Sequence, residues 1–513
     1  MILFTQITFV WQIAVSLCLL VNTTTEGDYL CEQAKPSTRP LGAPHYSDVC
    51  FSSRSKHPSN PDDPHNTFRD AAAFHATRLD WVYSDDMDWV AEIDRRGYAL
   101  TLAQHAATFA DWRKKGNLRG HIQDKNGDPV ALSFQVKWER WTACVNNPDY
   151  RERLLREKKA HLDAGVNGFQ FDDWGFGYQL LDQGACHCQY CAALAAEMKL
   201  DLNDKKQMET LQRQSLWDFY TWLTSSLDEY AGHHVPFSCN WYPGNQYQGG
   251  KYEPFFRKFF DYGIGEARYK NYGPRGLHKV VEKSREINSA QIFTHNTSDG
   301  PEILRNVASL CYAMGAHMIV PWDVYQHGKP YRYFGKPEEY ADLFGFVRGI
   351  ADYLDGYEEV GAHMTEEDTA SQKHSKVTNP SFSIQGNSNL LGFARAKPGN
   401  RMAPVVIHLV QWGKTPQSES RVELNTDHFF GGKPLSVHLL TPAAYDKEQH
   451  AGAEEQAEAL RKAGEQRGAA QAGAYASLVS ARPLETRVEA NSTFVAVPPL
   501  HPWGILVVEP VNQ

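Results

Sequence analysis

Two adjacent carboxylates follow a short apolar stretch in the first half of the chain. Residues 166–171 (VNGFQF) are typical of a buried strand, and Asp172, Asp173 and Trp174 come directly after them. Residues 147–165 begin with Asn-Pro and end with Gly, which predicts a helix before this strand. In closed parallel barrels, catalytic residues lie where the strands end. A single Asp at such a place could also cap a turn or pair with an arginine.

The same arrangement recurs along the chain, because most of the predicted strands end in a polar or acidic side chain. These residues are Asp80, His105, Asp172 with Asp173, Asn240, Glu266, His295 and Asp323, and Trp81, Trp174, Trp241 and Trp322 adjoin four of them. In a barrel, these strand ends would meet in one bowl. Glycoside hydrolysis needs two carboxylates beside the scissile bond, and aromatic rings can pack on sugar faces. The sequence therefore predicts a carbohydrate-cleaving site.

The best candidate pair is Asp172 or Asp173 with Glu266. Strand alternation directs Asp172 to the same side as Gln170, toward the barrel axis, although an uncertain register keeps Asp173 as an alternative. In a polar, hydrogen-bonded place Asp172 is expected to remain ionised and act as nucleophile. Glu266 follows apolar residues that would favour its protonated form, so we expect it to be the acid. Asp323 is a further candidate acid or base.

Other polar and aromatic residues near the strand ends are predicted to bind substrate. The set is Arg78, Asp80, His105, Trp174, Asn240, Trp241, Arg268, His295 and Trp322. Arg78 and Arg268 could instead hold a neighbouring carboxylate ionised.

Four cysteines form a second candidate site. Cys186, Cys188 and Cys191 make a C-x-C-x-x-C motif, and Cys144 lies at the exit of the preceding predicted strand. Four thiolates so placed fit a closed tetrahedral zinc site. Disulfides are the alternative in an exported protein, although cysteines one residue apart pair awkwardly. We expect structural zinc.

Eight strand–helix units are predicted between residues 66 and 358, which is the size of a TIM barrel. The strands are expected at 74–83, 98–103, within 111–147, and at 166–171, 235–240, 260–265, 291–294 and 317–321. A Rossmann-like sheet is the competing fold, but no G-x-G-x-x-G or phosphate-binding loop follows any strand.

From residue 376 to 513 the predicted strands follow one another without helices. They lie at 390–394, 405–410, 435–440, 493–497 and 503–508, which predicts an antiparallel β-sandwich domain. Residues 446–475, rich in Ala, Glu, Gln and Gly, interrupt this domain as a polar insertion to which we assign no function.

The composition and the N-terminus indicate an exported protein of two domains. The length of 513 residues is too great for one core, and the net charge of −9 gives no reason to expect a nucleic-acid partner. Residues 1–25 contain an apolar run that predicts a signal peptide, and no other stretch could span a membrane. Residues 26–65 look irregular, and Cys31 could pair with Cys50 there. We expect a secreted, periplasmic or extracellular location.

The predicted barrel, the stretch 168–174 and the following C-x-C-x-x-C motif resemble the TIM-barrel glycoside hydrolases. The cysteine pattern is similar to the zinc loop of family 42 β-galactosidases, which implies Cys144, Cys186, Cys188 and Cys191 as ligands. That family has Asn-Glu at the fourth strand, where this chain has Asp-Asp. A fourth-strand Asp with a later acid resembles α-retaining barrels such as α-galactosidases and α-amylases, which also carry C-terminal β-domains.

The resemblance implies a secreted glycoside hydrolase of the retaining kind that acts on a poly- or oligosaccharide and uses no organic cofactor. A catalytically inactive barrel that binds carbohydrate is the main alternative. A metal-dependent hydrolase of the amidohydrolase kind would need clustered histidines, whereas the chain offers isolated His75 and His105. The oligomeric state is open.

Overall fold

The computed structural model describes most of the chain in separate ranges. These are residues 29–52, 54–55, 67–84, 86–104, 121–130, 142–172, 174–175, 186–243, 252–266, 269–294, 300–321, 335–364, 381–413, 419–463 and 468–511. The predicted signal peptide, residues 1–25, lies outside them.

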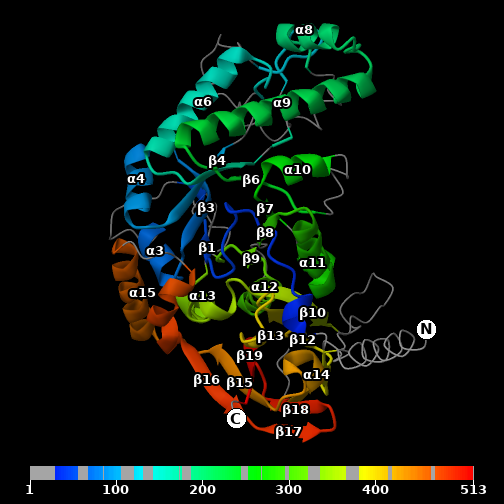
Figure 1. Ribbon diagram of the computed structural model, residues 1–513. Coiled ribbons are helices and arrows are strands. Elements are labelled where there is room, and N and C mark those ends of the chain that lie inside the picture. Colours follow the sequence, from blue (N-terminus) through cyan, green and yellow to red (C-terminus); the bar gives the residue numbers. More distant parts are fainter. Residues whose placement is uncertain are drawn as a thin grey trace, which may run out of the picture.

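Eight parallel strands form a closed barrel (Figure 1). In order they are β1 (Cys50–Phe51), β3 (Arg78–Tyr83), β4 (Ala99–Gln104), β5 (Gly168–Phe171), β6 (Phe237–Cys239), β7 (Tyr262–Gly265), β8 (Ala290–Phe293) and β9 (His317–Met318), and the short β2 (Arg54–Ser55) pairs with β3. The backbone N–H of Val320 donates to the carbonyl of Cys50 at 2.9 Å and so joins the last strand to the first. The predicted TIM barrel is confirmed.

One of the predicted strands is wrong and one was missed. β4 pairs directly with β5, with Thr101 opposite Gly168, so no strand lies between them and the described residues of 111–147 add none to the barrel. The first strand is instead β1, inside the segment 26–65 that was predicted to be irregular. Two residues are too few for a detectable pattern. Because the two errors cancel, β5 is still the fourth strand, as predicted.

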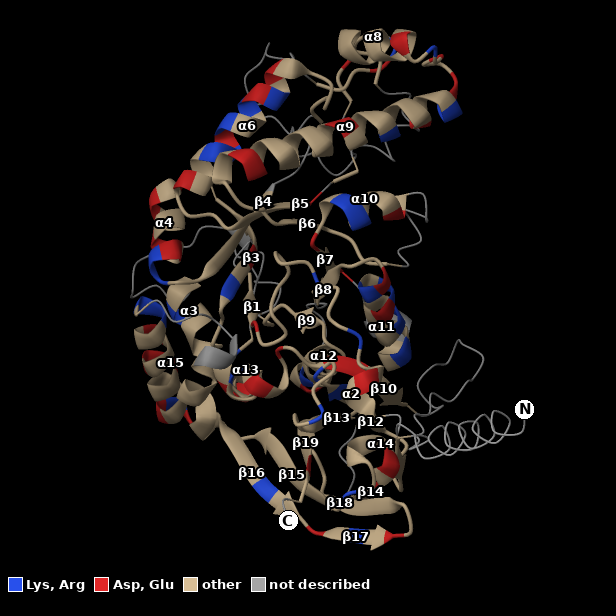
Figure 2. Ribbon diagram, in the orientation of Figure 1, with Lys and Arg blue, Asp and Glu red and all other residues tan. Residues whose placement is uncertain are grey.

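Helices surround the barrel strands (Figure 1). They are α3 (Thr67–Ala73), α4 (Met87–Arg95), α6 (Pro148–Asp163), α8 (Gln189–Glu197), α9 (Lys205–Ala231), α10 (Glu253–Phe259), α11 (Tyr269–Glu286), α12 (Pro301–Ala313) and α13 (Pro337–Gly349), and one of them, α8, packs on the helix α9. The side chain of Asn147 caps α6 by accepting from the N–H of Asp149 and Tyr150. Charged residues are spread along the outer helices α6, α9 and α11, while the barrel strands carry few (Figure 2). None of the helices in the described ranges combines the length and apolarity needed to cross a membrane.

Alternation along the strands separates the barrel interior from the layer beneath the helices. Phe171 of β5 points outward, where it stacks on Phe237 at 5.7 Å and meets the edge of Tyr220 of α9 at 5.5 Å. Tyr262 and Ile264 of β7 belong to the separate interior cluster. The next inward position on β7 is therefore residue 266, and on β5 it is residue 172.

The C-terminal domain is a sandwich of two antiparallel sheets. One sheet is ordered β10 (Glu358–His363), β12 (Leu390–Ala396), β13 (Val405–Gln411), β19 (Trp503–Pro510), β15 (Leu435–Pro442) and β16 (Val479–Leu484). The other is ordered β11 (Phe382–Gln385), β14 (Ser420–Asn425), β18 (Ser492–Val497) and β17 (Thr486–Glu489), and α14 (Thr426–Phe430) follows β14. The predicted β-sandwich is confirmed, and its first strand begins at Glu358, before the expected start at 376.

The segment predicted as a polar insertion is folded and packs on the barrel. It contains α15 (Lys447–Lys462) and the 3₁₀ segment η5 (Gly468–Leu478), which contact α3 and α13. Glu454 of α15 accepts hydrogen bonds from Arg461 at 2.6 Å and from Tyr475 at 3.0 Å. His75 of the barrel contacts His450 of α15 at 2.7 Å between ring nitrogens.

Residues 29–49 cross from the sandwich to the barrel. The short helix α2 (Leu30–Gln33) lies in the sandwich core, together with Cys31, whereas Cys50 lies in the barrel interior. Both cysteines are free thiols, so the predicted Cys31–Cys50 disulfide is wrong.

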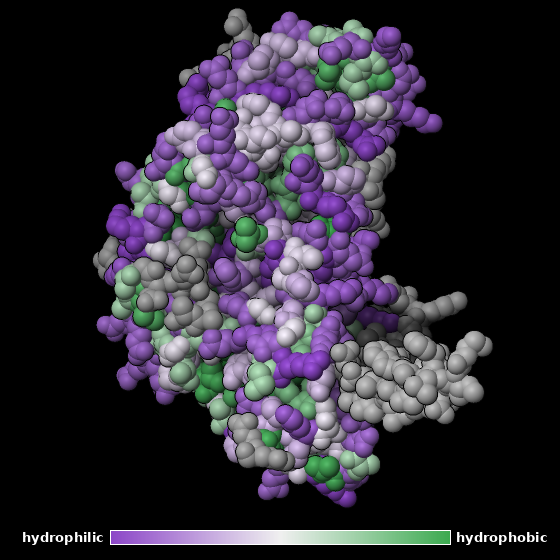
Figure 3. All heavy atoms as spheres, in the orientation of Figure 1, coloured by the Kyte–Doolittle hydropathy of each residue, from purple (hydrophilic) through white to green (hydrophobic). Residues whose placement is uncertain are grey.

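On the face shown in Figure 3, hydrophobic residues occur in small separate groups.

A buried ion pair joins the two domains. Glu359 of β10 accepts from His278 of α11 at 2.8 Å and from Arg285 at 3.1 Å. Burial alone would raise the pKa of Glu359, but His278 and then Arg285 lower it to about 2. Burial likewise opposes the charge of His278, whose pKa is nevertheless raised by Glu359.

We expect Glu359→Gln to reduce the free energy of unfolding by about 3 kcal/mol between pH 5 and 6, where both partners are charged. The contribution of ionised Glu359 to the free energy of unfolding is fully present above about pH 4.3, the pKa of a Glu in the unfolded chain, and is lost as the pH falls toward 2. Denaturant unfolding at several pH values measures the difference. Glu253→Gln, which loses an exposed pairing with Arg257, is the control, and an effect of Glu359→Gln that does not depend on pH contradicts the ion pair.

Candidate active site

Three polar side chains follow three adjacent strands at the carboxyl edge of the barrel. Asp172, Asn240 and Glu266 come directly after β5, β6 and β7. The Nδ2 of Asn240 donates to Oδ1 of Asp172 at 3.0 Å, and the backbone N–H of Asn240 donates to the carbonyl of Phe171 at 3.3 Å. Asp172 and Asn240 are half-buried, whereas Glu266 is exposed. The structure thus brings Asp172 and Asn240 together.

The positions of Asp172 and Glu266 suit two carboxylates on either side of a bound substrate. Neighbouring strands lie about 4.8 Å apart, so backbones two strands apart are separated by about 10 Å. Side chains directed inward from both positions can approach the separations of about 5–9.5 Å used by glycosidases. The apolar residues before Glu266, which were expected to favour its protonated form, do not bury it: the hydroxyl of Tyr262 points deeper, to Asp80 at 2.9 Å, and Glu266 is exposed.

Sequence reasoning missed Tyr83, the last residue of β3. Its hydroxyl donates a short hydrogen bond to Oδ2 of Asp172, and the indole Nε1 of Trp81 donates to the Tyr83 hydroxyl at 3.1 Å. Regular alternation from Asp80 would place Tyr83 on the outer face. The pairing of β3 with β4 shifts between Leu79 and Val82, and Trp81 has a φ of +57°. No pattern in the sequence marks this irregularity.

Arg78 and Asp80, predicted to bind substrate, form a buried ion pair inside the barrel. The guanidinium donates from Nε to Oδ2 of Asp80 at 2.7 Å and from Nη2 to Oδ1 at 2.9 Å. Arg78 is 6% exposed and Asp80 is 0% exposed, so substrate cannot reach them. Burial lowers the pKa of Arg78, but Asp80 more than offsets it and raises that pKa well above its usual value. The alternative interpretation of Arg78, as a partner of a carboxylate, is the one the structure supports.

Trp174 and Trp241, predicted as sugar platforms, are core residues instead. Trp174 is 2% exposed and lies edge-on to Phe256 at 4.8 Å. Trp241 is 7% exposed, and its ring stacks flat on the ring of Phe256 from α10, with the ring centroids 3.4 Å apart. Phe256 thus covers one ring face of Trp241, and α10 keeps both indoles away from solvent.

Six predicted site residues lie outside the described ranges. They are His105, Asp173, Arg268, His295, Trp322 and Asp323. Their roles remain predictions from the sequence.

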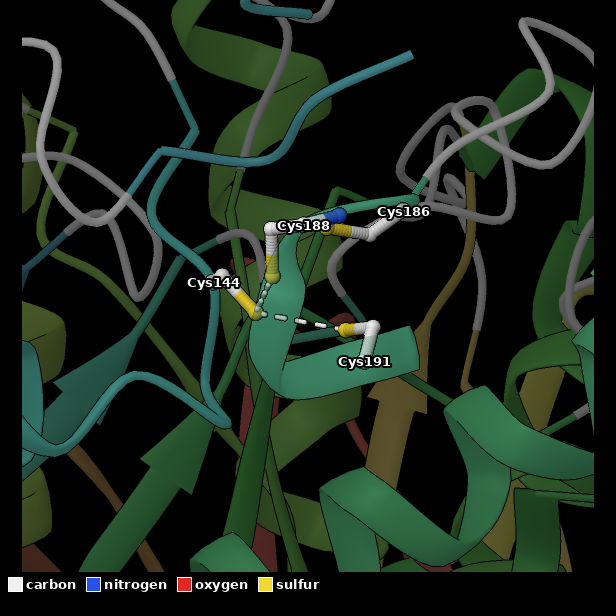
Figure 4. Close-up of side chains that lie close together, drawn as sticks. All are labelled: Cys144, Cys186, Cys188 and Cys191. Carbon is white, nitrogen blue, oxygen red and sulfur yellow. Dashed lines mark hydrogen bonds between the residues drawn. The ribbon is translucent and has the colours of Figure 1, made fainter. Parts of the chain in front are cut away.

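The four predicted metal-ligand cysteines converge in one buried cluster (Figure 4). Their sulfur atoms all lie within 4.8 Å of one another, and Cys144 Sγ is 3.5 Å from both Cys188 Sγ and Cys191 Sγ. Tetrahedral zinc with Zn–S bonds of about 2.3 Å requires sulfurs about 3.8 Å apart. A disulfide would require about 2.05 Å. The described cysteines are free thiols, so the cluster can hold a metal ion.

The cluster ties together the two connections on either side of β5. Cys144 ends the connection from β4 to α6, while Cys186 and Cys188 end the connection from β5 to α8, and Cys191 lies in the first turn of α8. Asn146 supports it by donating to Cys191 Sγ at 3.3 Å and to Ser215 of α9 at 2.8 Å. The connection that begins with Asp172 is therefore fixed at its far end.

Known structures share this architecture. An α-L-fucosidase isoenzyme 2 from Paenibacillus thiaminolyticus matches with a TM-score of 0.52 and 10% identity over 92% of this chain and 100% of its own. A cycloisomaltooligosaccharide glucanotransferase from Paenibacillus sp. matches with a TM-score of 0.55 and 9% identity over 90% and 85%. An α-amylase from H. orenii matches with a TM-score of 0.51 and 11% identity over 91% and 99%.

What these proteins share with the chain is the fold. Searches of protein-family models and of curated proteins found no match. The similar structures therefore support a barrel followed by a β-domain over nearly the whole chain, without assigning the chain to one family.

Proposed function

We propose that this protein is a glycoside hydrolase that cleaves O-glycosidic bonds of a poly- or oligosaccharide. The observation that carries the proposal is the placement of Asp172, held by Asn240, at the end of the fourth strand, with Glu266 two strands along. The similar fucosidase, glucanotransferase and amylase structures support it, because they are named for reactions of sugars on the same architecture.

The proposed reaction is a double displacement that retains the anomeric configuration. A carboxylate oxygen of Asp172 bonds to the anomeric carbon while the glycosidic bond breaks and Glu266 protonates the departing oxygen. Glu266 then takes a proton from water, whose oxygen bonds to the anomeric carbon and releases Asp172. Asn240 orients the carboxylate in both steps.

Hydrolysis of a panel of 4-nitrophenyl glycosides, including the α-L-fucoside, α-galactoside and α-glucoside, tests the proposal. Proton NMR of the first-formed sugar reports the stereochemistry, and the same anomer as the substrate is expected. Inversion would overturn the nucleophilic role of Asp172. Sugar binding without turnover of any glycoside would favour the inactive carbohydrate-binding barrel.

We also propose that the four-cysteine cluster holds structural zinc. Purified protein is expected to contain about one zinc per chain by elemental analysis, and Cys191→Ser is expected to lose it and to unfold at lower denaturant concentration. Cys311→Ala, which removes a buried thiol outside the cluster, should retain the metal. Full zinc content in Cys191→Ser would contradict the site.

We further propose secretion after removal of the N-terminal signal. The intact mass of the protein produced by its own cells tests this, and an unprocessed N-terminus would contradict it.

A further inference from the structure

We infer that Tyr83 is a positioning residue for Asp172, aimed at it by a β-bulge at Trp81. This inference rests on the proposed function and adds a residue to that site. Tyr83 joins Asp172, Asn240 and Glu266 in the site, and it comes from β3, on the opposite side of Asp172 from Asn240 in strand order.

The bulge determines which way Tyr83 faces. Arg78 and Asp80 both point into the barrel, where they contact Tyr262. Regular alternation would then direct residues 79, 81 and 83 outward. Leu79 does so, but Trp81 joins the interior cluster, and its φ of +57° is rare for a bulky side chain. A bulge shifts the alternation by one residue, so Tyr83 turns inward as well.

The cost of this backbone irregularity indicates a function. A non-glycine residue in the left-handed region costs about 1–3 kcal/mol, and such residues cluster at active sites. At Trp81 the unusual conformation produces two contacts. The indole Nε1 donates to the Tyr83 hydroxyl at 3.1 Å, and that hydroxyl donates to Asp172.

Each carboxylate oxygen of Asp172 thereby accepts from a side chain in the described part of the chain. Tyr83 donates to Oδ2 and Asn240 donates to Oδ1. Rotation of the carboxylate would break both bonds, so its plane is fixed before substrate arrives. The hydrogen bond from Trp81 polarises the Tyr83 hydroxyl and strengthens its own donation. When the bond from Asp172 to the sugar breaks, negative charge returns to the carboxylate and both donors stabilise it.

Tyr83→Phe, which keeps the ring and removes the hydroxyl, tests the inference. We expect kcat to fall about 10²-fold, as when other single donors to a developing charge are removed. KM is expected not to rise, because Tyr83 contacts Asp172 and is not proposed to bind the substrate. Slower hydrolysis of the glycosyl-enzyme also lets this intermediate accumulate, which lowers KM. Tyr230→Phe is the matched control, since the Tyr230 hydroxyl donates to the Asp163 carboxylate at 2.8 Å on the outer helices. Equal kinetics of the two variants would overturn the inference.

A second measurement does not depend on turnover. In protein labelled with ¹³C at the tyrosine ring carbon that bears the hydroxyl, Asp172→Asn should move the NMR signal that Tyr83→Phe removes, and should leave the Tyr230 signal in place. A wild-type protein that hydrolyses none of the glycosides overturns the proposed function. A Tyr83 signal that Asp172→Asn leaves unmoved overturns the Tyr83 contact itself.

Discussion

Replacing Asp172 by asparagine is expected to reduce kcat by about 10⁴-fold or more, the scale seen when a catalytic nucleophile is removed. The amide has nearly the same shape as the carboxylate but is a far weaker nucleophile toward the anomeric carbon. Asn240 can still donate to its oxygen, so the site keeps much of its geometry. Sugar binding measured by calorimetry should therefore persist while turnover of 4-nitrophenyl glycosides stops.

Asp163→Asn is the control for this substitution. Asp163 accepts from Tyr230 on the outside of the barrel, so the same change of chemistry there should leave kcat unaltered. If Asp172→Asn retained full activity, another carboxylate would have to be the nucleophile. Asp173 is the candidate that the sequence offers.

Replacing Arg78 by methionine is expected to lower the free energy of unfolding by about 3–5 kcal/mol. The substitution removes the charge that compensates Asp80 in the barrel interior, where Asp80 is 0% exposed. Tyr262 would remain as a neutral donor to Asp80, which is insufficient for a buried carboxylate. Equilibrium unfolding in denaturant measures the loss.

The double variant Arg78→Met with Asp80→Leu separates charge from packing. It removes both members of the closest buried pair, so it should be more stable than Arg78→Met alone, while Asp48, whose Oδ2 lies 3.8 Å from Nη1 of Arg78, loses the same neighbour in both variants. Arg257→Met is the surface control; Arg257 pairs with Glu253 on the solvent side of α10, and its loss should cost less than about 1 kcal/mol. A double variant as unstable as the single one would show that Arg78 contributes mainly by packing.

The architecture was predictable because most barrel strands and all the long sandwich strands are apolar runs bounded by turns. The strand before Asp172 illustrates this, since Phe169 and Phe171 alternate with Gln170 and the structure follows that alternation. β1 was not predictable, because its two residues acquire strand pairing only from β3 and the chain after β9.

The candidate site was predictable only in part. Asp172, Asn240 and Glu266 could be identified because each follows an apolar run typical of a strand. The same pattern does not show where a strand ends, so a residue in the middle of a strand can be mistaken for one at its end. Asp80 lies in the middle of β3, so a polar residue that looked like a site residue is a buried ion-pair partner. Tyr83 depends on the bulge at Trp81, which leaves no periodic trace in the sequence.

The path of residues 29–51 has a consequence for the order in which the molecule is assembled. These residues leave the ribosome early, yet α2 packs among sandwich residues such as Leu390 and Leu409, and β1 is joined by Val320. β3, which pairs with β1, follows it closely, but these other partners are made hundreds of residues later, so residues 29–51 must wait for most of the chain. Such distant contacts slow folding and leave apolar residues uncovered meanwhile. Residues 29–51 thus reach their final place only after partners far along the chain have been made.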